Sequence, residues 1–451
     1  MIKKILIANR GEIAARIIRT CHKLGIKTVA VYSEADQQAP YVNMANESYL
    51  LGPPRVNESY LKAEKIISIA KNANVDAIHP GYGFLSENGD FVEACEAANL
   101  IFIGPKSNIM RQMGSKIEAR KAMEKAGVPI IPGTRESVDT SEEAIDIAKK
   151  IGYPIMLKAS AGGGGIGMQI VNSEKELKEA FQSNAKRAES FFGDGAMFLE
   201  KKLENARHIE VQILADQHGN VVHLFERECS IQRRNQKVIE EAPSPFISKK
   251  IRDEIGHSAV KAAKTLGYTN AGTVEFLVDQ QGKHYFLEMN TRIQVEHPIT
   301  EEITGLDIVA EQINIADNKN LNYTQNDLKI QGHAIEARIY AEDPKTFFPS
   351  PGQITTFAPP EKEYIRLETA VTSNYEVTPF YDPMISKLIV KGVDREEAMS
   401  MLRDALSNFK IEGIKTNIPM LISIVNNEEF KKGNTTTAFI EENYLPMLAK
   451  N

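Results

Sequence analysis

The sequence predicts a mixed α/β and α+β fold, and three observations carry that prediction. Apolar strand patterns alternate with amphipathic helices over about the first hundred residues, which indicates a Rossmann-like unit. A glycine-rich loop then lies between two apolar strands. The segment from Gly332 onward mixes strands, helices and Pro-rich turns in the manner of an α+β unit. At 451 residues the chain is long enough for roughly three domains.

Composition places the chain among ordinary globular proteins. Apolar residues make up 42% and charged residues 25%, and the net charge of −6 gives no sign of a nucleic-acid-binding surface. No apolar run approaches transmembrane length, and no signal-peptide pattern follows Met1, so no membrane association is expected. Cys21, Cys95 and Cys229 are far apart, which argues against a disulfide framework and favours a reducing cytoplasm.

The amino-terminal unit begins with a buried-type strand at 4–8, an amphipathic helix after Gly11 and a second strand at 27–32. The single Gly11 does not match the spaced-glycine fingerprint of dinucleotide sites, so a scaffold role is favoured there. A glycine-rich turn at 79–88 follows the strand at 75–78. Such turns bind ligands in open α/β sheets, but a purely structural turn fits the local sequence equally well.

A helix at 117–126 and a Pro-interrupted hinge at 128–133 precede the glycine-rich loop. The glycines at 162–165 and 167 would let backbone N–H groups approach an anion closely, and Lys158 ends the first flanking strand as a point charge for phosphate. No Gly-Lys-Ser/Thr sequence follows, which excludes a Walker A motif. A mobile loop that covers phosphate is favoured over a flexible linker, because linkers are not normally held between two strands.

The segments 271–278 and 284–298 are the centre of the expected site. Folded symmetrically into a hairpin about Gln281-Gly282, they place Glu275 directly opposite Glu288, where two carboxylates repel unless a cation lies between them. Carboxylate oxygens suit Mg²⁺ or Mn²⁺ with nucleotide phosphate, although an asymmetric loop would undo the pairing. If the second segment runs extended, its polar face carries Glu288, Asn290, Arg292, Gln294 and Glu296. A solvated edge strand is the alternative explanation of that face.

Further polar residues occur in strand-like segments on either side of this hairpin. The segment 207–215 alternates, and one of its faces carries His208, Glu210 and Gln212. Arginines and a lysine crowd 227–237, which indicates either a solvated charged surface or a cradle for anions beside a metal site. Cys229 has no base paired with it in the sequence and is expected to be a small buried residue. The strand at 332–342 carries Arg338 on its polar face.

Taken together, these segments resemble the biotin carboxylase family of the ATP-grasp superfamily. The motifs that carry the resemblance lie in order along essentially the whole chain, at 7–14, 79–85, 158 with its glycine loop, 232–234, 288–298 and 381–384. The resemblance implies a Rossmann-like domain over 1–113, an ATP-grasp domain over 114–330 with a lid at about 131–203, and an α+β domain over 331–451. It also implies ATP-dependent carboxylation of biotin on a carrier protein, with bicarbonate as the carbon source.

The resemblance assigns roles to individual residues of this sequence. It implies a nucleotide site made of Lys116, Lys158, Gly163, Gly164, Gly165, Gly167, Glu200, Lys201, Lys202, Leu203, His208, Gln232, Asn235, Glu275 and Leu277. The implied ligands of Mg²⁺ or Mn²⁺ are Glu275, Glu288 and Asn290. The residues implied to bind bicarbonate or biotin are Tyr82, Lys237, Arg292, Gln294, Val295 and Arg338. Glu296 is the implied catalytic base, with Arg292, Arg338 and Lys237 as further catalytic residues.

Two positions depart from the family pattern, because Ile166 replaces a common Lys or Arg and Asn235 replaces a frequent His. There are three other interpretations: a different ATP-grasp ligase such as a carbamoyl-phosphate synthetase half, the amino-terminal part of a pyruvate, propionyl-CoA or methylcrotonyl-CoA carboxylase, and a non-catalytic ATP-binding regulator. The chain ends at Asn451 without a Met-Lys-Met biotin-acceptor motif, which favours a free-standing subunit of acetyl-CoA carboxylase in fatty acid synthesis. Its expected partners are a biotinylated carboxyl carrier protein, carboxyltransferase subunits and a second copy of the chain.

Overall fold

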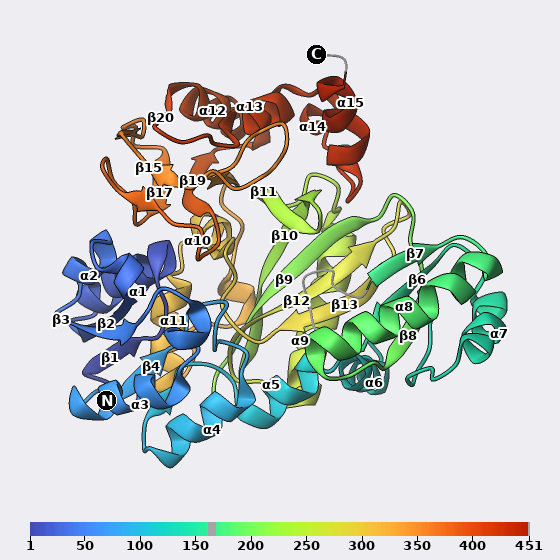
Figure 1. Ribbon diagram of the computed structural model, residues 1–451, viewed down its shortest axis with the longest axis horizontal. Helices are drawn as coiled ribbons and strands as arrows, with labels where there is room; N and C mark the ends of the chain where they lie inside the picture. Colours follow the sequence, from blue (N-terminus) through green and yellow to red (C-terminus); the bar gives the residue numbers. More distant parts are fainter. Residues whose placement is uncertain (161–167, 450–451) are drawn as a thin grey trace.

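The protein is described by a computed structural model over residues 1–160 and 168–449. The predicted loop glycines Gly163, Gly164, Gly165 and Gly167, and the departure at Ile166, lie outside the described residues. Figure 1 shows a blue amino-terminal part, a green-to-yellow central part and an orange-to-red carboxy-terminal part, all arranged around the long central sheet. The mixed α/β and α+β prediction is confirmed.

The amino-terminal part is a parallel sheet of five strands in the order β3-β2-β1-β4-β5. Its apolar strands are buried because helices cover the sheet, and Ile13, Ile17 and Cys21 of α1 face its core. The strands are β1 (Lys4–Ile7), β2 (Lys27–Ser33), β3 (Glu47–Gly52), β4 (Ala77–His79) and β5 (Ile101–Phe102). The helices are α1 (Gly11–Lys23), α2 (Pro40–Met44), α3 (Ala63–Asn72), α4 (Gly89–Ala97) and α5 (Ser107–Gly114).

A small three-stranded sheet, ordered β7-β6-β8, extends to one side of the central part (Figure 1). The two apolar strands expected on either side of the glycines are present, and they are antiparallel partners of one another. The elements in this region are α6 (Lys116–Ala126), α7 (Ser141–Ile151), β6 (Ile155–Ala159), β7 (Met168–Val171), α8 (Glu174–Phe192) and β8 (Met197–Lys201).

The central sheet has eight strands in the order β13-β12-β9-β10-β11-β14-β19-β17, and its neighbours are antiparallel. The sheet contains strands from both sides of the domain limit expected at residue 330, because β11 pairs with β14. Its strands are β9 (Arg207–Ala215), β10 (Val221–Arg233), β11 (Gln236–Ala242), β12 (Asn270–Val278), β13 (His284–Asn290), β14 (His333–Tyr340), β17 (Ile365–Thr369) and β19 (Met384–Gly392). The helices that accompany its central part are α9 (Lys249–Leu266), α10 (His297–Thr304) and α11 (Ile308–Ala316).

The remaining carboxy-terminal elements pack on the far end of this sheet. Their shared core includes Ile335 and Ile339 of β14 together with Leu402 of α12 and Leu421 of α13. These elements are β15 (Gly352–Gln353), β16 (Thr356–Ala358), β18 (Glu376–Val377), α12 (Arg395–Asn408), β20 (Lys410–Glu412), α13 (Ile418–Asn426), α14 (Glu428–Lys431) and α15 (Leu445–Leu448). Within residues 1–160 and 168–449, no helix is both long enough and apolar enough to span a membrane.

The predicted hairpin is present, and Glu275 is the direct cross-strand partner of Glu288. Near the turn, however, Val278 pairs with His284, one residue away from the pairing that symmetry about Gln281-Gly282 requires. An irregularity between the Phe276 and Glu275 pairs then skips Leu287 and restores the expected register. The strand also ends at Asn290, so the expectation of an extended segment through 298 is wrong.

Candidate active site

A cavity of about 740 Å³ lies where the amino-terminal, central and carboxy-terminal parts meet. It brings together the following predicted site residues: Tyr82, Lys116, Lys158, Glu200, Lys202, His208, Gln232, Asn235, Lys237, Glu275, Leu277, Glu288, Asn290, Arg292, Gln294, Val295, Glu296 and Arg338. Lys201 and Leu203 do not line it. The Lys201 ammonium instead donates to the carbonyl oxygens of Gly152 and Tyr153, at 2.9 and 3.0 Å.

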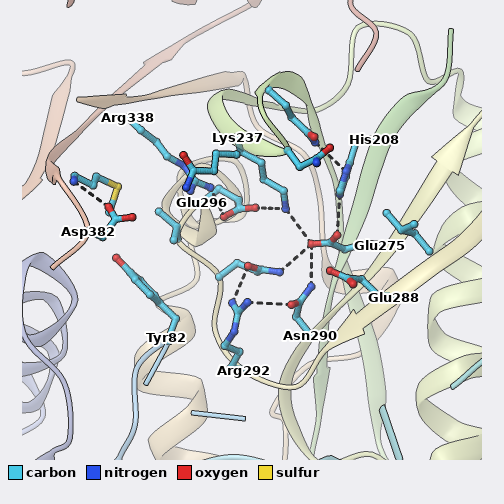
Figure 2. A pocket seen from close by; sticks show the side chains of 18 of the residues that line it. Tyr82, His208, Lys237, Glu275, Glu288, Asn290, Arg292, Glu296, Arg338 and Asp382 are labelled. Atoms are coloured by element: carbon cyan, nitrogen blue, oxygen red, sulfur yellow. Dashed lines mark hydrogen bonds and ion pairs between the residues drawn. The ribbon is translucent and has the colours of Figure 1, made fainter. Parts of the chain in front are cut away.

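Lys237 forms the centre of the cavity's charged wall, as Figure 2 shows. Its Nζ lies 2.5 Å from Glu210, 2.9 Å from Glu275 and 2.7 Å from Glu296. Burial opposes the ammonium charge, but the three carboxylates outweigh it and hold the pKa of Lys237 well above its usual value. The lysine therefore remains a cation and fixes the positions of three buried acids.

Glu296 lies between two cations, because its other oxygen accepts from Arg338 at 2.9 Å. Burial would raise the pKa of this carboxyl, but Lys237, Arg338 and Arg227 together hold the pKa well below its usual value. Arg338 also donates through Nε to Glu240 at 2.6 Å, which fixes the plane of the guanidinium. Glu296 is therefore held as an ionised carboxylate, the protonation state that a general base requires, beside a guanidinium that also lines the cavity.

The predicted metal ligands fit a hard cation. Burial and repulsion by Glu275 raise the pKa of Glu288, and no hydrogen bond or ion pair joins its carboxylate to another side chain in the described parts of the chain. Asn290 lies beside the pair and donates to Glu275 at 2.9 Å. Two carboxylates and an amide oxygen on one cavity wall match the ligands that Mg²⁺ and Mn²⁺ prefer.

A second group of potential ligands, His208, Glu210 and Glu275, lies nearby. Two of its members already contact the Lys237 ammonium, which supplies the positive charge that a metal would bring. His208 Nε2 lies 2.9 Å from Glu275, and although burial opposes its protonation, that carboxylate raises the pKa of the imidazole. Glu275 belongs to both groups, and the Glu275, Glu288 and Asn290 set is the better candidate because no ion pair neutralises Glu288 among the described residues.

At the end of the cavity that carries Lys116, Lys158 and Lys202, positive charges outnumber the acids that could neutralise them. Glu200 forms ion pairs with Lys158 and with Arg120. Burial and the neighbouring charge of Lys158 lower the pKa values of Lys116 and Lys202. Clustered cations of this kind suit a polyphosphate group.

The turn that carries Tyr82 is held by side chains of the amino-terminal sheet. Asn9 donates to the carbonyl oxygens of Pro80 and Tyr82, both at 2.7 Å, and His79 Nδ1 accepts from the backbone N–H of Gly81 at 3.0 Å. Gly81 has φ +61°, and a Cβ there would lie 2.9 Å from the Asn9 amide. The turn therefore requires glycine, and it presents Tyr82 to the cavity opposite Arg338 (Figure 2).

The cavity also contains functional candidates that the sequence did not assign. Glu12, Arg120 and Tyr381 line it, and Glu210 contacts Lys237 from behind. Arg120 could have been found from its position one helical turn after Lys116, and Glu210 from its position on the polar face that carries His208. Glu12 and Tyr381 are harder to predict from the sequence. They lie in motifs that the family shares, but those motifs do not by themselves indicate a role for either residue.

The charged segment 227–237 is only in part a solvated surface: Arg234, Asn235 and Gln236 at its turn are exposed, whereas the residues before them are buried. Arg227 is fully buried, and it donates to Glu210 at 2.5 Å and to Gln212 at 2.8 Å. Lys237 ends the same segment inside the cavity. Cys229 is buried as expected, and burial together with Glu210 raises the pKa of its thiol well above the usual value, which does not suit a nucleophile.

Known protein families and individual relatives match this chain over nearly its whole length. Family models match in order along the chain: biotin carboxylase, N-terminal domain, over 1–110; carbamoyl-phosphate synthase L chain, ATP binding domain, over 115–324; and biotin carboxylase C-terminal domain over 336–442. Biotin carboxylase 2 of Bacillus subtilis is 62% identical over 442 residues, covering 98% of this chain and 100% of the relative. A biotin carboxylase of Halalkalibacterium halodurans is 61% identical, covering 98% and 97%.

Solved structures agree with this similarity. The biotin carboxylase of Campylobacter jejuni in a βγ-ATP complex has a TM-score of 0.96 and 47% identity, covering 98% of this chain and 99% of that one. The biotin carboxylase domain dimer of Hydrogenobacter thermophilus 2-oxoglutarate carboxylase, solved with MgADP and bicarbonate, also has a TM-score of 0.96, with 49% identity and coverage of 99% and 98%.

Proposed function

The chain belongs to the biotin carboxylase family, and we propose on this basis that its cavity carries out the ATP-dependent carboxylation of biotin with bicarbonate through carboxyphosphate. One observation supports the roles that we give to individual residues. Glu296 is an ionised carboxylate fixed between Lys237 and Arg338, and all three line a cavity whose far end is rich in lysine. A base, an anion site and a phosphate site thus share one cavity.

In the first step we assign Glu296 as the base that takes the proton of bicarbonate. A bicarbonate oxygen then attacks the γ-phosphoryl group of ATP, so that a new P–O bond forms, the bond to ADP breaks and carboxyphosphate results. Lys237, Arg292, Gln294 and Val295 line the wall around Glu296 and would hold the bicarbonate. Lys116, Lys158, Lys202 and Arg120 offset negative charge at the phosphate end.

In the second step carboxyphosphate separates into CO₂ and phosphate, and the phosphate takes the proton from N1′ of biotin. The N1′ nitrogen then attacks CO₂, and Arg338 stabilises the negative charge that develops on the ureido oxygen. Tyr82 faces this position from the opposite wall. Carboxyphosphate and CO₂ are lost to water unless they are enclosed, which is a reason for a glycine-loop lid.

Glu275, Glu288 and Asn290 would hold Mg²⁺ or Mn²⁺, which supplies charge neutralisation at the phosphate groups of the nucleotide. His208, Gln232, Asn235 and Leu277 line the cavity beside this set and would contact the rest of the nucleotide. Asn235 can donate or accept a hydrogen bond but cannot carry the charge of a histidine there.

The wider setting also remains a proposal. We propose that the biotin is attached to a carboxyl carrier protein, that carboxyltransferase subunits use the product, and that the protein acts as a homodimer in the cytoplasm. We favour acetyl-CoA carboxylase in fatty acid synthesis as the complete enzyme, with another acyl-CoA carboxylase or pyruvate carboxylase as the alternative. The domain limits 1–113, 114–330 and 331–451 stay predictions.

The test is ATP turnover with each substrate omitted in turn. We expect ADP release to require bicarbonate and to increase when free biotin is added, with carboxybiotin formed in step with the added ADP. A matched reaction replaces biotin with ammonia. ADP release that responds to ammonia but not to biotin would instead favour carbamoyl-phosphate chemistry and overturn the proposal.

A further inference from the structure

Lys387 on β19 is a fully buried cation that contacts the site from outside the cavity. Its side chain has an exposed fraction of 0%, and it is absent from the residues that line the cavity. Its Nζ donates to the backbone carbonyl oxygen of Val295 at 2.7 Å and lies 3.2 Å from a carboxylate oxygen of Glu12. A lysine is rarely buried so completely without a specific partner, so both contacts call for an explanation.

The first contact fixes the turn that carries the base. The strand β13 ends at Asn290, so residues 291–296 have no sheet partner to determine their path. Val295 stands between Gln294 and Glu296, and all three line the cavity. A donor on the Val295 carbonyl oxygen sets the orientation of the following peptide bond, and with it the point from which Glu296 starts.

The second contact reaches the opposite wall of the cavity. The Glu12 oxygen that faces Lys387 also accepts a hydrogen bond from the Tyr82 hydroxyl. Glu12 lies on α1 of the amino-terminal part, whereas Val295 belongs to the central part and Lys387 to the carboxy-terminal part. One ammonium group therefore connects the wall that carries Glu296 with the wall that carries Tyr82.

Glu12 is the one carboxylate within ion-pair distance of Lys387 in the described chain, because Glu368, which faces Lys387 across the β17–β19 pair, is bound by Arg19 and Arg366. Glu336 on β14 is also fully buried nearby, yet neither of its carboxylate oxygens has a hydrogen-bond partner in the described chain. Burial raises the pKa of Glu336 well above its usual value, and the charge of Lys387 only partly opposes this. On the other side His297 is buried, and burial and Lys387 hold the pKa of its imidazole well below the usual value.

We propose that Lys387 is a positioning residue that sets the separation and orientation of the bicarbonate wall and the biotin wall. This inference rests on the proposed function and adds to it a residue that never touches a substrate. Without the ammonium, the Val295 carbonyl oxygen would be left in the interior without a donor, the Glu12 carboxylate would keep only the Tyr82 hydroxyl, and the 291–296 turn would relax. The nucleotide end would keep its own contacts, because Lys116, Lys158 and Glu200 are held by other elements.

The test compares Lys387→Met with the wild type. We expect KM for bicarbonate and for free biotin to rise by about tenfold to a hundredfold, the range that corresponds to one unsatisfied buried acceptor. The dissociation constant for ATP, measured by calorimetry, should change by less than about twofold, since no nucleotide contact is removed. Lys387→Arg, which keeps the charge and the donors, should recover part of the lost affinity for bicarbonate.

Arg395→Met is the matched control. Arg395 on α12 also bonds a buried acid, Glu241, and backbone carbonyl oxygens, but it does not line the cavity. Its loss should lower Tm without moving either KM. If Lys387→Met does not fold, Glu12→Gln serves in its place, because it removes the counter-ion and should raise both KM values.

Unchanged KM values in a folded Lys387→Met, with activity falling only as Tm falls, would overturn the inference. Such a result would leave the proposed function intact, because the wild type would still require bicarbonate for ATP turnover. A wild type that hydrolyses ATP without bicarbonate would instead contradict the proposed function itself.

Discussion

The guanidinium of Arg338, on strand β14, lies 2.9 Å from the carboxylate of Glu296, which precedes helix α10. The residue assigned to biotin and the residue assigned to bicarbonate are therefore direct neighbours, although 42 positions separate them in the chain. Two consecutive chemical steps thus share one ion pair, and substitutions can determine which residue serves which step.

Arg338→Ser should nearly abolish biotin carboxylation but retain a slow bicarbonate-dependent ATPase. Loss of one group that stabilises a developing oxyanion commonly costs about 3–4 kcal/mol, or roughly two to three decades in rate. Glu296→Ala should depress both reactions, because carboxyphosphate does not form without the base. ADP release and carboxybiotin formation should be measured in parallel, together with a melting curve for each variant.

The competing explanation of Arg338 is structural, since it also pairs with Glu240. In that case Arg338→Ser would lower Tm and reduce both rates in proportion. Equal loss of both rates with an unchanged Tm would assign the arginine to the ATP-dependent step and contradict the role given to it here. Because Arg338 helps to hold down the pKa of Glu296, its loss should raise that pKa, and the variant should be assayed over a range of pH so that a protonated base is not mistaken for a lost arginine.

Glu288→Gln should severely weaken the use of Mg-ATP while leaving the fold intact. The substitution removes one of two facing carboxylates, so the metal loses a charged ligand and the protein without metal loses a repulsion. Its Tm in the absence of metal should equal or exceed that of the wild type. Turnover as a function of Mg²⁺ concentration is the measurement, with Glu254→Gln on the exposed face of α9 as control. Full activity at low Mg²⁺ would rule out this metal site.

Stability should respond to pH through Glu240. Burial raises the pKa of this carboxyl from 4.5 to about 7, although Arg338 opposes the shift. Between these values the folded protein holds a proton that the unfolded chain has released, so this group makes the protein less stable as pH rises. Glu240→Gln removes that contribution and keeps an acceptor for Arg338. The Tm of the variant minus that of the wild type should therefore increase between about pH 5 and pH 7, and a constant difference would contradict the assignment.

Sedimentation at micromolar protein concentration should show a dimer. The expectation comes from the family, and a relative at 49% identity was solved as a dimer of its biotin carboxylase domain. The species present should be compared at several protein concentrations and with MgADP and bicarbonate added. A single monomeric species throughout would count against the homodimer for this chain.

The alternation of side chains and the turn dipeptide correctly predicted that Glu275 faces Glu288. The symmetric hairpin from which this was inferred is not the one that the structure has. The turn is tighter by one residue than symmetry requires, and the skipped Leu287 compensates before the pair is reached. Without that irregularity Glu275 would face Leu287 and the two acids would not meet. Periodicity predicts which side chains share a face, whereas bulges depend on packing that local sequence does not encode.

The local sequence could not show that certain charged residues are buried. Arg227 and Lys387 are fully buried, and their partners Thr300 and Val295 lie 73 and 92 positions away in the sequence. A charged side chain in a short window is usually solvated, so only the tertiary arrangement reveals that it is compensated. The resemblance supplied residues that touch substrates in the family, and it could not supply those that act from behind the cavity wall.

The pairing of β11 with β14 has a consequence for synthesis of the protein. A nascent chain that has emerged only to residue 330 already contains β9 to β13, but β11 would present an unpaired row of backbone donors and acceptors from Ile239 to Ala242. Such an edge invites association with other chains until β14 arrives to cover it. Fragments truncated before residue 333 should therefore aggregate during expression, whereas fragments that extend through β19 should stay dispersed for longer.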